Sequence, residues 1–231
     1  MSLRTITLHI LHTVHLGICQ SFCQFVIWEL LVADLFGMGG REEDRFANSV
    51  LRLRTSLFEW YGSLSQEEAR ETTRVQEFNI EMLGSKTHRA LKTKGMETKG
   101  LLPWCLRLLD VHGHVLGEAC RRPLKTSGEA LMGWFHIVKT SPRNMTAAQM
   151  QAMCSAGVKH LVQARRAGVP FKPKHHLFTH LIRSCRTHGN PRDFSTFLDE
   201  SCNRVLASVA RSAYSTVWEQ RTFAHFNELR Q

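Results

Sequence analysis

Hydrophobic positions recur every three or four residues along most of the chain, and strand-like alternation is almost absent. This spacing places apolar side chains on one face of a helix, which can then pack against neighbouring helices. The apolar series from Val14 to Leu35 predicts a first helix over residues 12–36, ended by the glycine-rich residues 37–40. The pattern therefore predicts a mostly α-helical protein, a bundle of about seven to eight helices.

Acidic and capping residues mark the starts of two further helices. Glu42, Glu43 and Asp44 place negative charge in the first turn of a second helix, where it suits the helix dipole. The inner face of this helix is predicted to comprise Phe46, Val50, Leu53, Leu57 and Trp60. Ser65 opens the capping-box pattern "SQEE", which predicts a third helix through about Leu83.

The remaining helices follow from apolar spacing between breaking residues. We expect a short helix over residues 101–109, with Pro103 near its start, and a helix over residues 126–139, with Trp134 and Phe135 facing inward. A further helix is expected over residues 146–167, capped by Thr146. Pro170 and Pro173 then break the chain before a helix that begins at Lys174, and a last helix is expected from about Ser195 to near the end. Between the third helix and residue 101, the lysine-rich linker suits a solvated or phosphate-contacting segment.

The length of 231 residues is enough for one domain with a full hydrophobic core. We therefore expect a single helical domain over residues 1–231, with a sub-division into N-terminal helices at 1–83, a basic linker region at 84–125 and C-terminal helices at 126–231. Hydrophobic residues make up 43% and charged residues 22%, which is an ordinary globular composition and excludes a chain that is disordered throughout.

The formal net charge of +10 gives the surface a positive potential that attracts polyanions such as nucleic acid. Residues 165–231 hold eleven Lys and Arg against five Asp and Glu. The predicted nucleic-acid-binding residues are Lys172, Lys174, His175, Arg183, Arg186, Arg192, Asn203, Arg204 and Arg211. The alternative is a solvated helix face, in which a pair such as Glu200 with Arg204 contributes little.

Seven cysteines without a repeated short spacing favour reduced thiols and an intracellular location, nuclear if the protein binds DNA. The apolar segment at residues 16–37 is interrupted by Gln20, Gln24, Glu29 and Asp34, which would be costly in a bilayer. We therefore expect a buried helix and no membrane contact. This apolar helix is also the candidate surface for homo-oligomerisation.

Two clusters raise the question of a metal site. His12, His15, Cys19 and Cys23 share one helical face, but this stripe is about 16 Å long and does not fit one zinc ion. A row of core or interface residues is the favoured interpretation. His176 and His180 are also four residues apart, and Cys185 with His188 would have to complete a structural zinc site there. We predict no metal site and no cofactor.

Other catalytic signatures are missing from the sequence. There is no glycine-rich phosphate loop followed by Lys-Ser or Lys-Thr, no dinucleotide-binding fingerprint and no nucleophile elbow. Cys185 beside Arg186 gives only a faint indication of an activated thiolate. An unreactive cysteine is the favoured interpretation.

Several stretches resemble a known family of transposon proteins. They are "LHILHTVHLGICQ", "FNIEMLGSKTHRALKTKGMETKGLLPWCLRLL", "KPKHHLFTHL" and "GNPRDFSTFLDESCNR". Together they look like the second half of transposase-like proteins of the Kyakuja-Dileera-Zisupton group, which carry an acidic-triad nuclease core of the ribonuclease-H type. The resemblance covers most of the chain through diffuse patterns. It implies the helical insertion and closing helices of a truncated ribonuclease-H-like core.

The resemblance also implies roles for particular residues. Glu200 and Asn203 match the motif that supplies the last acid of the family, and Lys174, His175 and His180 match the preceding helix. His9 stands where the second acid is expected, and imidazole is a poor ligand for Mg²⁺. Glu200 is therefore expected to be a vestigial catalytic residue, and Mg²⁺ would be a cofactor only in an active nuclease.

Three functions remain open on this evidence. The first is a transposon-derived, catalytically inactive protein that binds nucleic acid, DNA in preference to RNA, through phosphate contacts. The second is an all-helical protein-interaction module whose charge serves solubility or an acidic partner. The third is a metal-dependent DNA nuclease or transposase.

Overall fold

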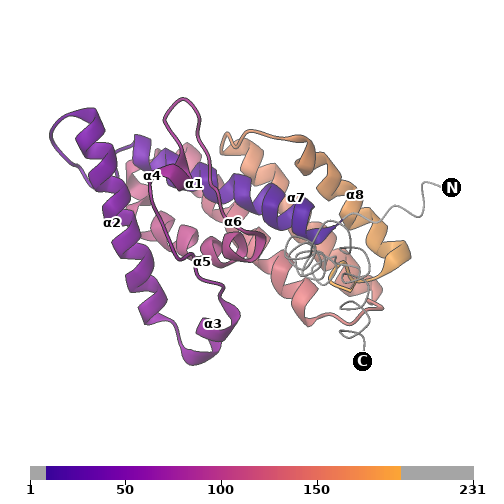
Figure 1. Cartoon of the computed structure of the whole chain (residues 1–231). Helices are drawn as coiled ribbons and strands as arrows, with labels where there is room; N and C mark the ends of the chain where they lie inside the picture. Colours follow the sequence, from indigo (N-terminus) through magenta and orange to yellow (C-terminus); the bar gives the residue numbers. More distant parts are fainter. Residues whose placement is uncertain (1–8, 194–231) are drawn as a thin grey trace, which may run out of the picture. The chain divides into compact units, whose positions relative to one another are not determined.

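The predicted first helix is a continuous helical segment in the computed structural model (Figure 1). It consists of η2 (Leu11–Cys19), whose turns are of the wide π type, and α1 (Gln20–Val32). Val14, Ile18 and Phe22 are buried, because α5 (Gly95–His112) and α8 (Pro173–His188) both pack against this segment. The segment therefore supplies much of the core around which the other helices are arranged.

The structure describes residues 9–193, all of which belong to the first of two units, Met1–Phe194. In this part of the chain there are eight α-helices and no strand, which confirms the predicted mostly α-helical bundle. The predicted single domain over residues 1–231 stays a prediction. The predicted last helix, from about Ser195, lies outside the described residues.

Leu11–Val32 is also the one helical segment of the described residues long and apolar enough to cross a membrane, with a mean hydropathy of 1.3. Within its most apolar window, 67% is buried inside the fold. The core helix of a soluble protein passes the same test, as does a signal sequence. The burial of this segment agrees with the prediction of a core helix, and the predicted lack of membrane contact stays a prediction.

Helix α2 (Glu42–Ser63) begins at the predicted acidic residues and lies at one end of the described unit (Figure 1). Val50, Leu53, Leu57 and Trp60 are buried as predicted. Phe46 is half-buried, and its ring stacks on Trp28 of α1 with the ring centroids 5.5 Å apart. The amphipathic pattern thus identified the face by which α2 packs against the core.

The predicted third helix is wrong in its length. Ser65 forms the predicted capping box with Glu68, but α3 (Gln66–Glu71) ends six residues later, and α4 (Ile80–Leu83) is a separate short turn. Between them the chain is held by long-range contacts. The Tyr61 hydroxyl accepts a hydrogen bond of 3.0 Å from the Val75 N–H, and Val75 and Phe78 are buried. Burial of this segment against the core overrides its local helical tendency.

Residues 84–125, predicted as a basic linker region, contain a long core helix. Helix α5 starts at Gly95, six residues before the predicted start at 101, and it continues past Pro103. The glycines make this possible: a Cβ on Gly95 would lie 2.2 Å from Leu11 Cδ1, and one on Gly100 would lie 2.5 Å from Thr73 O. In sequence they weaken a helix, but in the fold they allow close packing.

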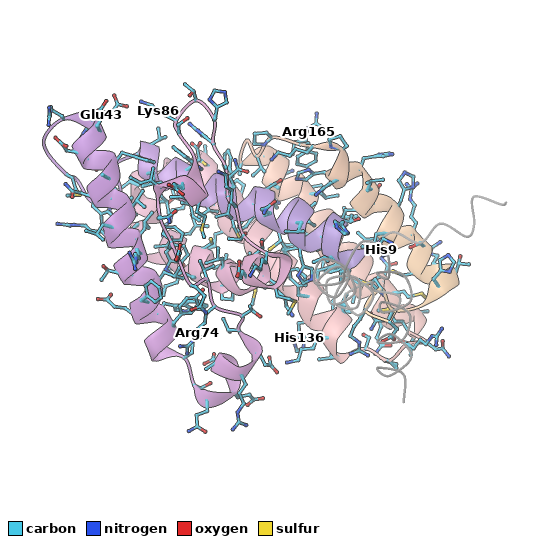
Figure 2. The ribbon with its side chains drawn as sticks, viewed as in Figure 1. His9, Glu43, Arg74, Lys86, His136 and Arg165 are labelled. Carbon is cyan, nitrogen blue, oxygen red and sulfur yellow. The ribbon has the colours of Figure 1, made fainter. Side chains whose placement is uncertain are left out.

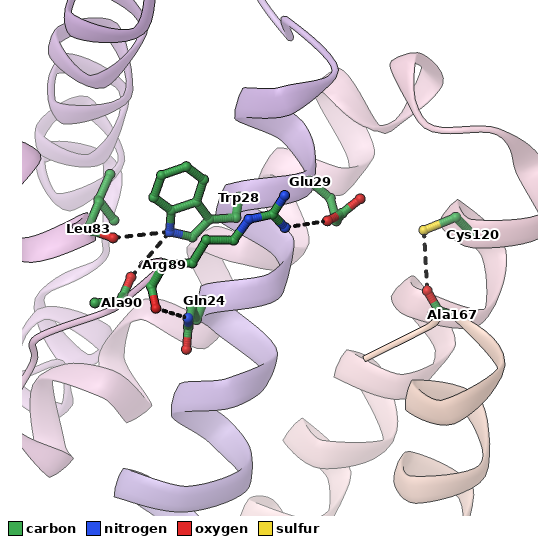
Figure 3. Close-up of polar contacts among 8 residues, drawn as sticks. All are labelled: Gln24, Trp28, Glu29, Leu83, Arg89, Ala90, Cys120 and Ala167. Carbon is green, nitrogen blue, oxygen red and sulfur yellow. Dashed lines mark hydrogen bonds and ion pairs between the residues drawn. The ribbon is translucent and has the colours of Figure 1, made fainter. Parts of the chain in front are cut away.

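The turn between α4 and α5 is fixed to α1 by side-chain hydrogen bonds (Figure 3). The Trp28 indole N–H lies 3.2 Å from Leu83 O and 3.3 Å from Ala90 O. Gln24 donates to the carbonyl of Arg89, whose guanidinium in turn pairs with Glu29 at 2.9 Å. The polar residues that interrupt the apolar segment are thus used to hold this turn.

The second half of the unit is a helical hairpin with α8 packed against it. Helices α6 (Glu118–Thr140) and α7 (Ala147–Arg166) pack together extensively, and the 3₁₀ turn η3 (Gly113–Val115) precedes them. Helix α6 starts eight residues before the predicted 126, while Trp134 and Phe135 are buried as predicted. Thr146 caps α7 by a capping box with Gln149, which confirms the predicted start.

Candidate nucleic-acid interface

The net positive charge of the protein arises from one part of the sequence. Residues 9–129 contain fifteen Lys and Arg and also fifteen Asp and Glu, so their formal charges cancel. Residues 130–192 contain ten Lys and Arg and neither Asp nor Glu. An even distribution of the twenty acidic residues would place about five in a stretch of this length. The excess of ten positive charges, equal to the formal net charge, therefore lies in α6, α7, α8 and their connections.

Helix α8 presents part of this charge to solvent. Phe178, Leu181, Ile182 and Cys185 form its buried face. The opposite side carries exposed polar and basic side chains, which are Lys172, His176, His180, Arg183 and Arg186. Because the apolar residues fix the rotation of the helix, these five side chains must face outward.

Helix α7 and the loop before it extend the exposed positive charge. Lys159, Arg165 and Arg166 are exposed on α7 (Arg165 is labelled in Figure 2), and Arg143 is exposed in the loop. The Arg143 carbonyl accepts a hydrogen bond of 2.8 Å from Asn190 N–H, which holds this loop beside the end of α8. We refer to the following seven side chains as the α7–α8 basic surface: Arg143, Lys159, Arg165, Arg166, Lys172, Arg183 and Arg186.

None of these seven cations forms an ion pair with a carboxylate of residues 9–193. The nearest carboxylates in the sequence, Glu129 and Asp193, pair with Lys125 and Arg192 respectively. The basic surface can therefore contact an anion without first breaking an internal ion pair within this part of the chain.

Lys174, predicted as a phosphate contact, forms an internal contact between α8 and η2 and is therefore a weaker candidate for that role. Its ammonium group donates a hydrogen bond of 2.7 Å to the carbonyl of Leu16 in η2. Its aliphatic chain covers Gly17, where an added Cβ would lie 3.0 Å from Lys174 Cδ. Lys174 thus anchors α8 to the central helix.

His175, also predicted as a nucleic-acid contact, is buried and is therefore a weaker candidate than the exposed cations. The backbone N–H of Lys172 lies 2.9 Å from His175 Nδ1, so the imidazole closes the first turn of α8. Phe171 stacks on the ring, with the centroids 4.4 Å apart. Burial lowers the pKa of His175, which favours the neutral imidazole that this hydrogen bond requires.

Arg192 is also held by internal contacts, although it is exposed. Its guanidinium donates to the carbonyl of Lys139 at 2.7 Å and pairs with Asp193 at 3.2 Å. It thereby satisfies a carbonyl at the C-terminal end of α6. Arg192 is consequently a weaker candidate for phosphate contact than Arg183 or Arg186.

The other predicted site residues, Glu200, Asn203, Arg204 and Arg211, lie outside the described residues. The additional cations at Arg143, Lys159, Arg165 and Arg166 were missed as candidates because none belongs to a motif. The signal that would have identified them is the absence of acidic residues over 130–192.

The cysteine and histidine stripe of the first helix belongs mostly to the core. His15, Cys19 and Cys23 are buried, whereas His12 is exposed. Burial raises the pKa of the Cys19 and Cys23 thiols well above the ordinary value, so they are poor nucleophiles. Among residues 9–193 no group of three or more His, Cys, Asp and Glu side chains could hold a metal ion.

Cys185 is likewise unsuited to nucleophilic chemistry. It is buried in the α8 interface, and burial raises the pKa of its thiol to about 12. It lies nine residues after His176, which is half a turn out of phase on a helix of 3.6 residues per turn. Cys185 therefore lies on the opposite face from His176 and does not complete a zinc site with it.

A second buried polar pair lies between α6 and α7. Ser127 Oγ lies 2.9 Å from His160 Nδ1 and donates to the His160 carbonyl at 3.0 Å. Burial lowers the pKa of His160 to about 4. A Ser-His contact of this kind resembles part of a catalytic triad, but both residues are fully buried and a substrate could not reach them.

Comparisons of the chain with protein-family models, curated proteins and solved structures gave no match.

Proposed function

We propose that the chain is a transposon-derived helical protein that binds nucleic acid, DNA in preference to RNA, and that does no chemistry on it. The single observation that carries the binding is the α7–α8 basic surface, whose seven exposed cations all belong to residues 130–192, a stretch with neither Asp nor Glu. The preference for DNA and the transposon origin rest on the resemblance of the sequence to transposases. A nuclear location would follow from this function.

The physical basis of binding is the neutralisation of phosphates. Each Lys or Arg that contacts a phosphate releases condensed counterions, so affinity falls steeply as the salt concentration rises. Arg183 and Arg186 lie three residues apart on α8 and present two cations to one side of the duplex. Such contacts position the protein without reading the base sequence, because they reach only the backbone.

The test measures the affinity of the full chain for a mixed-sequence duplex as a function of salt. We expect the wild-type affinity to fall by a power of the salt concentration, and Arg183→Ala with Arg186→Ala to reduce the slope of log K against log salt by about two. The matched control is Arg41→Ala with Lys86→Ala, which removes the same charge from cations paired with Asp44 and Glu42.

The control separates local contact from total charge. If the duplex responds to net charge alone, both double variants will weaken binding equally, and the assignment to the α7–α8 basic surface will be wrong. If the wild-type chain does not bind at low salt, nucleic-acid binding itself is excluded. A single-stranded RNA of the same length tests the expected preference for DNA.

The proposed inactivity rests on the residues that match the family motif. A metal-dependent nuclease of this type needs two or three carboxylates around hard cations, and the resemblance supplies Glu200 alone with His9 in the place of a second acid. The test is nicking of supercoiled DNA with Mg²⁺ or Mn²⁺. We expect none; cleavage that disappears in Glu200→Gln would establish the nuclease instead.

A protein-interaction module is the second candidate, and a groove at the other end of the unit favours it. The groove has a volume of about 720 Å³ and lies between α1, α2 and residues 84–86. Trp28, Phe46 and Ile80 form an apolar part of its lining, with Ile80 43% exposed, and charged side chains such as Glu42 and Arg45 form the rest. Solvent-exposed apolar surface of this kind is typical of protein contacts.

The two functions predict different behaviour of an Ile80→Asp variant. The Asp carboxylate in the groove should abolish the binding of a protein partner, because this charge would have to be buried in the complex. The same variant should bind duplex DNA as the wild type does. Loss of duplex binding in Ile80→Asp would show that the nucleic-acid contact is not confined to α7 and α8.

A further inference from the structure

Two exposed histidines meet on the outward face of α8. His176 and His180 are one turn apart, and their Nε2 atoms are separated by 2.9 Å. The rings are nearly perpendicular, with an interplanar angle of 81° and centroids 4.5 Å apart. The spacing of four residues places both side chains on one side of the helix, so the contact follows directly from the secondary structure.

The distance of 2.9 Å between the two Nε2 atoms matches the distance between two neighbouring ligand atoms on one metal ion. Zinc and copper lie about 2.0–2.1 Å from an imidazole nitrogen, so two nitrogens at a right angle around the ion would be about 2.9 Å apart. A tetrahedral angle would require roughly 3.3 Å, which small rotations of two exposed side chains would provide. The helix thus holds the two donor atoms close to the chelating geometry before any ion is present.

We propose that His176 and His180 form a binding site for a divalent transition-metal ion, Zn²⁺ or Cu²⁺, through their two Nε2 atoms. The remaining coordination positions face solvent, where water or an external ligand would fill them. Imidazole suits these ions and is a poor ligand for Mg²⁺ and Ca²⁺, which prefer oxygen. The site differs from the structural zinc site considered from the sequence, since Cys185 is buried on the opposite face.

A direct hydrogen bond between the imidazoles accounts for the same distance. One Nε2–H would then donate to the other Nε2. Metal binding requires both Nε2 atoms to be free of protons, so the donor imidazole would have to change tautomer and carry its proton on Nδ1 instead. The hydrogen bond and the metal ion therefore compete for the same pair of nitrogen atoms.

The site does not depend on the proposed function, because it needs only the two side chains and the ion. It lies between Lys172, the N-cap residue of α8, and Arg183 of α8, within the exposed face that carries the basic surface. A bound ion would add two positive charges there and would offer open positions to a phosphate oxygen.

The experiment titrates Zn²⁺ into the full chain, without an affinity tag, by calorimetry. We expect one site that His176→Ala and His180→Ala each weaken by about tenfold or more, because chelation by two groups held together is lost. His136→Ala is the matched control, since His136 is also an exposed histidine but lies on a different helix, α6. It should leave the affinity unchanged, and Mg²⁺ should give no signal at this site.

A second variant keeps the number of histidines constant. Leu177→His with His180→Ala places the two imidazoles at adjacent positions, which do not face each other on a helix. We expect this variant to bind Zn²⁺ as weakly as His180→Ala. Leu177 is 37% exposed, so the substitution does not create a cavity in the core.

Nuclear magnetic resonance of the imidazoles gives a readout that does not rely on affinity. Zn²⁺ should shift two ring signals together, and these should be the signals missing in His176→Ala and His180→Ala. The proposal is overturned if both single variants retain the wild-type affinity, or if the shifted signals belong to other residues.

Discussion

Two regions of the described unit, one around α2 and one on α7 and α8, differ in their balance of charges. At the α2 end, cations face carboxylates: Arg41 pairs with Asp44, Lys86 with Glu42 and Arg89 with Glu29. Figure 2 labels Glu43 and Lys86 near α2, and Arg165 near the C-terminal end of α7. The seven exposed cations on α7, α8 and the adjoining loops, by contrast, belong to residues 130–192, which contain neither Asp nor Glu.

The net charge of the whole chain therefore does not represent the local charge of either region. Matched charges largely cancel beyond the Debye length of about 8–10 Å, whereas unmatched charges of one sign reinforce one another. A polyanion should therefore be attracted to α7 and α8 and scarcely to α2. The groove beside α2, with its partly apolar lining, is suited to a different kind of contact.

The largest expected effect comes from removing the side chain that seats α8. Phe178 is fully buried and its ring meets Trp134 at a centroid distance of 5.3 Å. Phe178→Ala should lower the free energy of unfolding by about 3–5 kcal/mol, measured by urea denaturation. Phe46→Ala, at the half-buried contact between α2 and Trp28, should cost less. Equal losses would show that the two ends are packed alike.

The pH dependence of stability should come next in size. Burial lowers the pKa of His160 to about 4, whereas the unfolded chain has an ordinary histidine pKa near 6.5. The unfolded state therefore binds a proton first as the pH falls. The stability contributed by the neutral imidazole is complete above pH 6.5 and is lost between pH 6.5 and 4, by up to about 3 kcal/mol.

Urea denaturation at several pH values checks this expectation. His15 is also buried, and burial lowers its pKa to about 4, so it should add to the loss. His160→Gln should reduce the dependence of the free energy of unfolding on pH by the contribution of this one histidine. His136→Gln, at an exposed position, should leave that dependence unchanged. An unchanged slope in His160→Gln would mean that the buried imidazole accepts a proton in the folded state.

A smaller effect tests how far the basic surface extends onto α7. Arg165→Ala with Arg166→Ala should reduce the salt dependence of duplex binding by up to two in log K against log salt. If α8 lies at the centre of the contact with the duplex, this double variant should reduce the salt dependence less than Arg183→Ala with Arg186→Ala does. A larger loss would move the centre of the interface to the end of α7.

The smallest effect is expected at the matched end. Arg89 and Glu29 are 36% and 29% exposed, and an ion pair of this kind contributes less than about 1 kcal/mol. A double-mutant cycle, with alanine at each position, should give a coupling energy that decreases in high salt. A coupling that is large and independent of salt would mean that the pair is shielded from solvent.

The sequence by itself determined the elements that depend on neighbouring residues. The start of α2 at Glu42, the capping box at Ser65 and the cap at Thr146 were predicted because their interactions span three or four residues. The contact between His176 and His180 follows from the same helical spacing. The separation of charge is also written in the sequence, since it requires only the order of the residues.

The tertiary structure determined the features that local sequence patterns did not predict. The segment that includes Val75 leaves the helical pattern because the Tyr61 hydroxyl and the core hold it, and α5 starts early because Gly95 and Gly100 permit close contact. Lys174 and His175 resemble surface cations in the sequence, yet the fold buries one and fastens the other to η2. These outcomes depend on partners many residues away, whose positions only the packed chain fixes.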